Sequence, residues 1–166
     1  MVIDDRVGNP ATILGVDYGR VRIGLAIAEA PAQLARPLLT LDRVNRNEDM
    51  RRLRELVREH RVRQIVVGLP LRLDGTPGEM AKEATRFAAR VRKQLGLPVH
   101  MLDERLTSWE AERLLEEQSG RVLHHAKSRA TPGRAAGASV DAVAAAVILR
   151  EYLQRHCATK SDPELI

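Results

Sequence analysis

The chain has 166 residues, 44% of them apolar and 30% charged, a composition typical of one soluble globular domain. No apolar run is long enough to span a bilayer and the single Cys157 excludes an intrachain disulfide, so we expect a cytoplasmic protein without a membrane partner. The formal net charge of +5 favours a polyanionic partner such as nucleic acid, while an aromatic content of 2% argues against recognition by base stacking.

Three short strands are predicted at the start of the chain. Apolar runs indicate strands at 12–18, 22–28 and about 37–41, and the short turns between them are typical of an antiparallel meander. Asn45 or Asn47 can cap the helix that follows. Its apolar positions are Met50, Leu53, Leu56 and Val57.

A strand, a helix and another strand follow in the middle of the chain. The strand at 64–70 is apolar enough to be buried on both faces, and Gly96 with Pro98 ends the helix after it. That helix has an apolar stripe of Met80, Ala84, Phe87, Ala88, Val91 and Leu95. The fifth strand is expected at 98–102. Because helices now separate the strands, we expect the later strands to add in parallel.

The rest of the chain predicts two more helices separated by a basic loop. The first is capped by Thr107 or Ser108 and runs to about Leu115, and the second spans about 140–156. We expect a single domain over residues 1–166, of class α/β, with a five-stranded mixed sheet and helices on both faces. The core is expected at about 12–156 and includes a mobile basic loop at about 119–139. A disordered tail is expected at about 157–166.

Three acids interrupt the apolar pattern where a charge is costly. Asp17 ends a buried strand, Glu104 follows the fifth strand, and Asp141 lies in an Ala-rich helix on the same face as Ala145 and Ile148. Carboxylates from scattered elements are typical ligands of magnesium, and two such ions about 3.5–4 Å apart can hydrolyse a phosphodiester. The pattern therefore predicts a divalent-metal site.

Simpler interpretations of these acids are open. Asp141 taken alone is a helix cap or a first-turn acid, which stabilises a helix by about 1 kcal/mol. Asp103 and Glu104 are adjacent, so on a strand they point to opposite faces and only one joins a site easily. Glu104 is preferred, although a shift of one residue in register would select Asp103.

Four segments together resemble the YqgF (RuvX) family of small RNase H-like nucleases. The resemblance covers about residues 12–153, with the motifs in the family's order. The segments are Gly15-Val16-Asp17-Tyr18-Gly19-Arg20-Val21-Arg22-Ile23-Gly24-Leu25-Ala26, Val67-Gly68-Leu69-Pro70 with Asp74-Gly75-Thr76, Asp103-Glu104-Arg105-Leu106-Thr107-Ser108, and Val140-Asp141 through Leu149.

The resemblance implies an RNase H-like fold with catalytic, metal-binding acids at Asp17, Glu104 and Asp141. It implies a nuclease dependent on Mg²⁺ or Mn²⁺, with two ions expected, that acts on structured RNA in maturation of the 5′ end of 16S ribosomal RNA. Holliday-junction resolution on four-way DNA is the alternative. The stretch 119–139 departs from the family because it looks longer and more diluted in Ala and Gly.

Basic residues near the acids are the candidate phosphate contacts. They are Arg20, Arg22 and Arg105, with Lys127 and Arg129 in the basic loop. The chain is expected to act as a monomer or a homodimer, and junction resolution would require the dimer. A non-catalytic module that binds nucleic acid or ribosome precursors is a weaker alternative. An actin-like ATPase is disfavoured because the chain has no second Asp-x-Gly strand pair.

Overall fold

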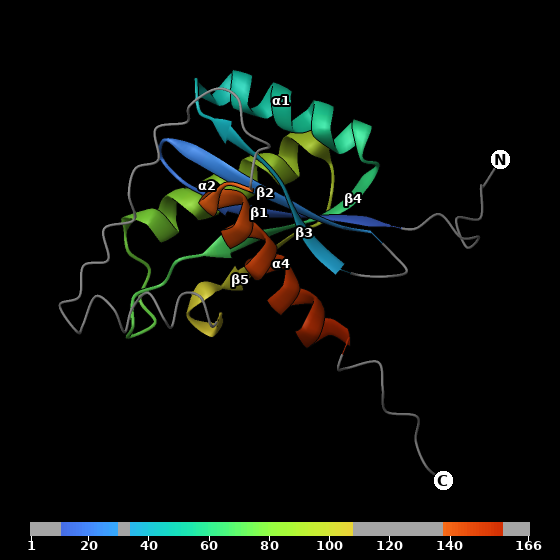
Figure 1. Cartoon of the computed structure of the whole chain (residues 1–166). Coiled ribbons are helices and arrows are strands. Elements are labelled where there is room, and N and C mark those ends of the chain that lie inside the picture. The colour runs from blue at the N-terminus through green and yellow to red at the C-terminus, as the bar shows by residue number, and fades with distance from the viewer. Residues whose placement is uncertain (1–10, 30–33, 108–137, 158–166) are drawn as a thin grey trace, which may run out of the picture.

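A computed structural model describes residues 11–29, 34–107 and 138–157, which form one mixed sheet covered by helices (Figure 1). The strand order is β3-β2-β1-β4-β5. The elements are β1 (Thr12–Tyr18), β2 (Arg22–Glu29), β3 (Leu34–Asp42), α1 (Arg46–Glu59), β4 (Val62–Leu69), α2 (Glu79–Leu95), β5 (Val99–Asp103), a 3₁₀ turn (Glu104–Leu106) and α4 (Val140–Cys157).

The five-stranded mixed sheet expected from the sequence is confirmed. β1, β2 and β3 form an antiparallel meander, and β4 and β5 extend the sheet in parallel beside β1. β3 is longer than the expected 37–41 because it lies at the edge of the sheet, where Pro37 is tolerated beside a shift in register. The expected boundaries of the other strands hold to within about two residues.

Several expectations concern residues outside the described ranges. The helix after Ser108, most of the loop at 119–139 and the tail beyond Cys157 belong to this group. Of the loop, the structure describes only its last two residues, and Ser139 there precedes α4. No helix in the described ranges is both long enough and apolar enough to cross a membrane.

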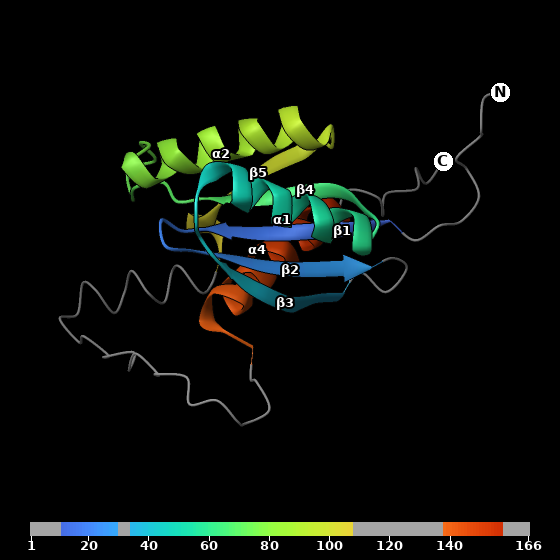
Figure 2. The same cartoon turned by 90° about the horizontal axis from the view of Figure 1, so that it is seen from above.

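The helices divide between the two faces of the sheet, with α1 and α2 on one face and α4 on the other (Figure 2). On the α1 and α2 face, Leu14 and Val16 of β1 pack into a core with residues of both helices, including Met50 and Phe87. Most of the predicted α2 stripe lies there, but Ala81 is fully buried and Met80 is not. On the other face, Ala26, Val66 and Leu102 pack against α4.

Glycines in the sheet allow α4 to lie directly against the strands. A Cβ atom added at Gly15 would lie 2.8 Å from Leu149 Cβ and 2.9 Å from the carbonyl oxygen of Ala145. At Gly24 it would lie only 2.0 Å from the carbonyl oxygen of Asp141. Because these contacts involve helix backbone, any larger residue forces α4 away from the sheet.

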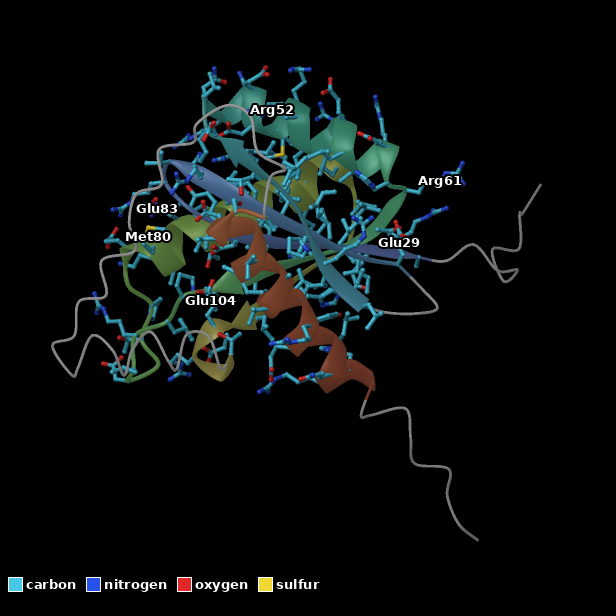
Figure 3. The ribbon with its side chains drawn as sticks, viewed as in Figure 1. Glu29, Arg52, Arg61, Met80, Glu83 and Glu104 are labelled. Carbon is cyan, nitrogen blue, oxygen red and sulfur yellow. The ribbon has the colours of Figure 1, made fainter. Side chains whose placement is uncertain are left out.

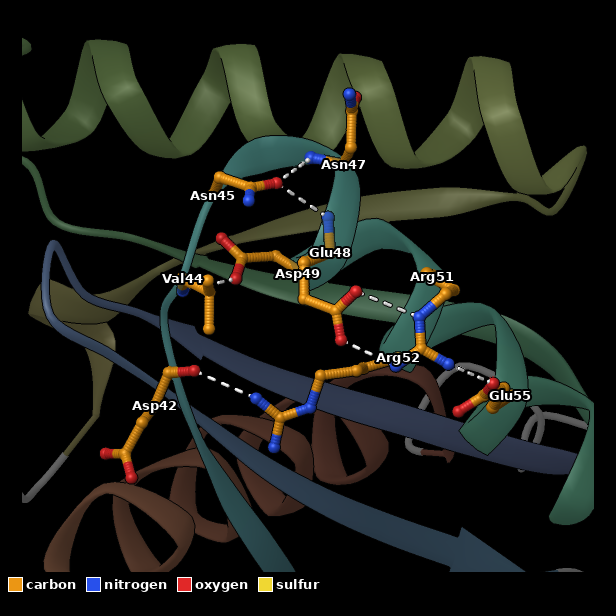
Figure 4. Close-up of polar contacts among 9 residues, drawn as sticks. All are labelled: Asp42, Val44, Asn45, Asn47, Glu48, Asp49, Arg51, Arg52 and Glu55. Carbon is orange, nitrogen blue, oxygen red and sulfur yellow. Dashed lines mark hydrogen bonds and ion pairs between the residues drawn. The ribbon is translucent and has the colours of Figure 1, made fainter.

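The start of α1 is anchored by a cap, by a hydrogen bond from the Val44 N–H to Asp49 (both drawn in Figure 4) and by a buried ion pair between Asp49 and Arg43. Asn45 Oδ1 accepts hydrogen bonds from the backbone N–H groups of Asn47 and Glu48, as expected of one of the two predicted caps. Asp49 is only 4% exposed and accepts from the Val44 N–H at 3.0 Å and from Arg43 Nε at 2.9 Å.

The same arginine reaches the turn that follows β1. Arg43 Nη1 donates to Tyr18 Oη at 2.8 Å and to the Gly19 carbonyl at 3.3 Å, and its guanidinium lies 4.9 Å from the Tyr18 ring centroid. The Tyr18 ring contacts Phe87 of α2, with centroids 5.0 Å apart. Arg43 therefore connects α1 to the residues immediately after Asp17.

We expect Gly24→Ala to lower the free energy of unfolding by about 1–3 kcal/mol, because the new methyl group meets helix backbone that cannot rotate away. Urea denaturation measures this loss, and amide hydrogen exchange should show reduced protection at the start of α4. In Gly68→Ala the nearest atoms are the ends of the Glu104 and Ile148 side chains, so a smaller loss is expected. Equal losses in the two variants would contradict this account.

Asp49→Ala should lower the free energy of unfolding by about 3 kcal/mol or more, since it leaves the largely buried Arg43 without its counter-charge. Urea denaturation again provides the measurement. The control is Glu48→Ala, one residue earlier, which removes a carboxylate from a far more exposed pair with Arg51 and should have much less effect. Similar losses in both variants would show that Arg43 does not depend on Asp49.

Candidate active site

Three carboxylates predicted from the sequence come from three different elements at one edge of the sheet. β1, β4 and β5 are parallel, so Asp17 near the end of β1 and Glu104 directly after β5 share the carboxyl-terminal edge. Asp141 lies in the first turn of α4, and its backbone contacts Gly24 at the same edge. Figure 3 shows Glu104 beside the lower end of the sheet, close to α4.

The contacts of the two strands on either side of β1 show that Asp17, Glu104 and Asp141 lie on the same face of the sheet. Asp17 pairs with Gly24 of β2, and the β1–β4 register brings Gly68 beside it on the other flank. The carbonyl oxygen of Asp141 covers Gly24, and a Cβ at Gly68 would lie 2.2 Å from Glu104 Oε1. Since Gly15, two residues before Asp17, faces α4, Asp17 also points to the α4 face.

The structure separates the roles of the adjacent Asp103 and Glu104. The Asp103 carboxylate accepts from Arg105 Nη2 at 2.7 Å, from Arg105 Nε at 3.1 Å and from the Arg105 N–H at 3.0 Å. These hydrogen bonds hold the pKa of Asp103 below its usual value. Glu104 instead extends over Gly68, so of the two acids it is the one on the face of Asp17.

Asp141 is a first-turn acid of α4 but not its cap. Ser139 Oγ accepts from the Ala142 N–H at 3.2 Å, which is the hydrogen bond of an N-terminal cap. The Asp141 carboxylate pairs instead with Arg22, whose Nε lies 2.9 Å from Oδ2, and its side chain is 30% exposed. The ion pair joins the start of α4 to the start of β2.

The donor chemistry of this edge suits a hard divalent cation, because the three side chains offer only carboxylate oxygens. The described residues nevertheless contain no group of three His, Cys, Asp or Glu side chains close enough together, as they stand, to hold a metal ion. One reason is visible in the contacts, since the Asp141 carboxylate points to Arg22. The side chains must move for the three acids to share an ion.

The candidate phosphate contacts within the described residues all carry acidic partners. Arg20 Nη2 lies 2.8 Å from Glu83 Oε1 and Arg20 Nε lies 3.1 Å from the same oxygen, which ties the β1–β2 turn to α2. Arg22 pairs with Asp141, and Arg105 pairs with Asp103. Arg105 also donates to the carbonyl of Leu73 at 3.3 Å. Lys127 and Arg129 lie outside the described residues.

Sequence reasoning missed the residues that hold the site in place. The burial of Asp49 could have been predicted from the sequence, because this charged residue lies directly beside the apolar stripe of α1 that begins at Met50. The role of Glu83 could not have been predicted, because nothing in the sequence of α2 indicates that its partner is Arg20, 63 positions away in the chain. Ser139 was assigned to the loop, and its role as the cap of α4 follows only from the helix start.

The Arg20–Glu83 pair predicts a pH dependence of stability. Hydrogen bonds from Arg20 lower the pKa of Glu83 below its usual value of about 4.3. Because the pKa is lower in the folded state, the pair stabilises the fold above about pH 4.3, and this contribution is lost as the pH falls through the lower value.

The expected result is that wild type and Glu83→Gln differ in stability at neutral pH and converge in acid. Urea denaturation over a series of pH values measures the difference, and carboxyl NMR titration reports the pKa of Glu83 directly. A difference that stays constant from about pH 6 to about pH 3 would contradict the assignment.

This chain is similar to known proteins in sequence and in fold. The family model RuvX, described as Holliday junction resolvase, matches residues 11–155. A protein of Anaeromyxobacter sp. (strain K) is 44% identical over 142 residues, which cover 86% of this chain and 96% of the relative. One of Koribacter versatilis (strain Ellin345) is 40% identical over 151 residues, covering 91% and 92%. Both are named "Putative pre-16S rRNA nuclease".

Among solved structures, RuvC of Thermus thermophilus has the same fold. The match has a TM-score of 0.51 at 15% identity and covers 89% of this chain and 97% of RuvC. RuvC is an RNase H-like protein, so the fold class expected from the sequence is confirmed. The match of the family model over most of the chain, together with relatives above 40% identity, shows that this chain belongs to the RuvX (YqgF) family.

Proposed function

We propose that this protein is a divalent-metal-dependent nuclease that hydrolyses phosphodiester bonds in structured RNA, in maturation of the 5′ end of pre-16S ribosomal RNA. One observation carries the proposal: Asp17, Glu104 and Asp141 meet at one edge and on one face of an RNase H-like sheet, brought there by glycines on both neighbours of β1. Family membership and the names of the relatives support the reaction and the substrate.

Asp17, Glu104 and Asp141 would hold Mg²⁺ or Mn²⁺, and we expect two ions. A bound divalent cation supplies the positive charge that activates the attacking water and neutralises charge developing on the phosphate. Asp17 and Asp141 serve as ligands, and Glu104 serves as a ligand or orients the water. For Asp141, binding a cation replaces one positive partner, Arg22, with another.

When a cation replaces Arg22 at Asp141, the basic residues beside the acids can bind the phosphates of the substrate. Arg22 released from Asp141 is free to bind a phosphate oxygen beside the acids, where its side chain is already 58% exposed. Arg20 is equally exposed and remains positioned by Glu83 at the turn after Asp17. Arg105 is held more firmly, by Asp103 and the Leu73 carbonyl, and contributes a fixed positive charge.

Resolution of four-way DNA junctions is the second candidate function. The description of the family model favours it. Paired cuts in a junction require two sites related by two-fold symmetry, so this function needs a homodimer, whereas RNA processing is possible for a monomer. We place the protein in the cytoplasm with ribosome precursors as partners, and we treat residues 1–166 as one domain.

Asp17→Asn should abolish metal-dependent cleavage while folding and nucleic-acid binding persist, because the amide keeps the shape of the side chain but loses the charge that binds the cation. The assay offers wild type and variant a precursor 16S RNA and a synthetic four-way DNA junction, with Mg²⁺ or Mn²⁺. Calorimetric titration with Mn²⁺ tests the metal ligand independently of turnover.

Asp42→Asn is the matched control, since it removes an exposed carboxylate at the same sheet edge and leaves the three acids intact. It should cleave and bind Mn²⁺ like wild type. Cleavage retained in Asp17→Asn would overturn the proposed site. Cleavage of the junction alone would transfer the proposal to the second function.

A further inference from the structure

Positive charge is concentrated on α2 and on the segment formed by α1 and the residues directly after it. Residues 46–63, which include α1, contain seven arginines and four acids, and residues 79–95, which form α2, contain five basic residues and two acids. Each segment therefore carries a net charge of +3, although the whole chain carries only +5. The remainder of the molecule is close to neutral.

Of the six acids on these helices, all but Glu59 form an ion pair within the described part of the chain. Glu48 and Glu55 both bind Arg51, Asp49 binds Arg43, Glu79 binds Lys82, and Glu83 binds Arg20. Several arginines of the same helices have no acidic partner within the described part of the chain. Arg54, Arg58 and Arg90 are among them, whereas Arg86 is close enough to Glu83 to help lower the pKa of that carboxyl.

α1 and α2 lie on the same face of the sheet and run in the same direction (Figure 2). Arg52 donates to the Asp42 carbonyl on the β3 side of α1, so Arg54 and Arg58 occupy the opposite flank, toward α2. On α2, Arg90 follows Glu83 by two helical turns. Arg90 therefore lies on the same side of α2 as Glu83, whose side chain contacts Arg20 in the β1–β2 turn.

The row formed by Arg54, Arg58 and Arg90 lies away from the candidate active site, about 12 Å or more along the axis from the start of each helix. The start of α1 is tied through Arg43 to Tyr18 and Gly19, directly after Asp17. From there the 14 residues of α1 extend about 21 Å toward the opposite edge of the sheet. That length spans several phosphates of one strand, which are about 3.4 Å apart along a duplex axis.

The surface has the chemistry of a phosphate-backbone site. Arginine pairs bidentately with phosphate oxygens, and unpaired arginines facing one another repel until an anion lies between them. Phe87, the aromatic residue of α2, is buried and offers no stacking surface for bases. Among the described residues, the strongly exposed large apolar side chains are Val21, Leu34, Val44, Leu73 and Val140, none of them on α1 or α2. The surface thus lacks the apolar anchors of a protein or membrane interface.

We propose that the row formed by Arg54, Arg58 and Arg90 is a second nucleic-acid interface, which binds the phosphate backbone of a duplex segment of the substrate away from the cleaved bond. The inference rests on the proposed nuclease function for the identity of the ligand. It adds a distal binding track on the face opposite α4, which recognises helical backbone without reading sequence.

The test is the salt dependence of binding by the triple variant Arg54→Gln, Arg58→Gln, Arg90→Gln. Fluorescence anisotropy measures the affinity for a labelled RNA duplex, and for a DNA duplex of the same length, over a range of salt concentrations. The slope of log affinity against log salt should fall by about 2–3, roughly one for each lost phosphate contact. The corresponding triple lysine variant keeps the charges and should recover most of the slope.

The control triple Arg36→Gln, Arg150→Gln, Arg155→Gln removes the same charge from β3 and α4. It should change the slope much less. Equal reductions in both triples would overturn the proposal, because they would show a response to net charge alone. Unchanged RNA and DNA binding with lost binding to anionic phosphatidylserine vesicles would also overturn it, in favour of a membrane surface.

Cleavage of a short oligonucleotide separates this proposal from the nuclease assignment. A substrate too short to reach α1 and α2 should be cut by the glutamine triple at the wild-type rate, while a long duplex substrate shows a raised KM with unchanged kcat. If wild type cuts nothing, the nuclease proposal fails and the binding titration still decides the interface. Rates lowered equally on short and long substrates would place these arginines at the active site and overturn the distal track.

Discussion

The arrangement of this protein depends on the direct contact between α4 and the sheet. At Gly15 and Gly24 the helix backbone and its side chains occupy the space where a Cβ atom would be. The contact leaves Asp141 over one neighbour of Asp17, while Gly68 on the other flank leaves space for the Glu104 carboxylate. A helix held even one methyl group farther away would carry Asp141 out of reach of the edge where the other two acids lie.

The turn after Asp17 is held from two directions by ion pairs. Arg43, with its buried partner Asp49, connects the turn to α1, and Arg20 with Glu83 connects it to α2. Both helices lie on the face opposite α4, so the strand that carries Asp17 is fixed from both sides of the sheet. Such support favours catalysis, because a cation or phosphate then meets ligands whose backbone is already in place.

The uneven distribution of charge over the two faces suggests how one small domain divides binding from chemistry. The α4 face carries the three acids, one of which, Asp141, is paired with Arg22. On α1 and α2 all acids except Glu59 are paired with cations in the described part of the chain, whereas Arg54, Arg58 and Arg90 form no ion pair there.

Apolar periodicity and the residues that end helices determined most of the secondary structure. Strands buried on both faces leave continuous apolar runs in the sequence, and Gly96 marks the end of α2. The same patterns made Asp17, Glu104 and Asp141 visible, since a charge within an apolar run stands out. Only the tertiary structure decided that Glu104 rather than Asp103 shares the face of Asp17, that Ser139 caps α4, and that Glu83 holds Arg20. These outcomes depend on register and on contacts between residues far apart in sequence, which no local pattern records.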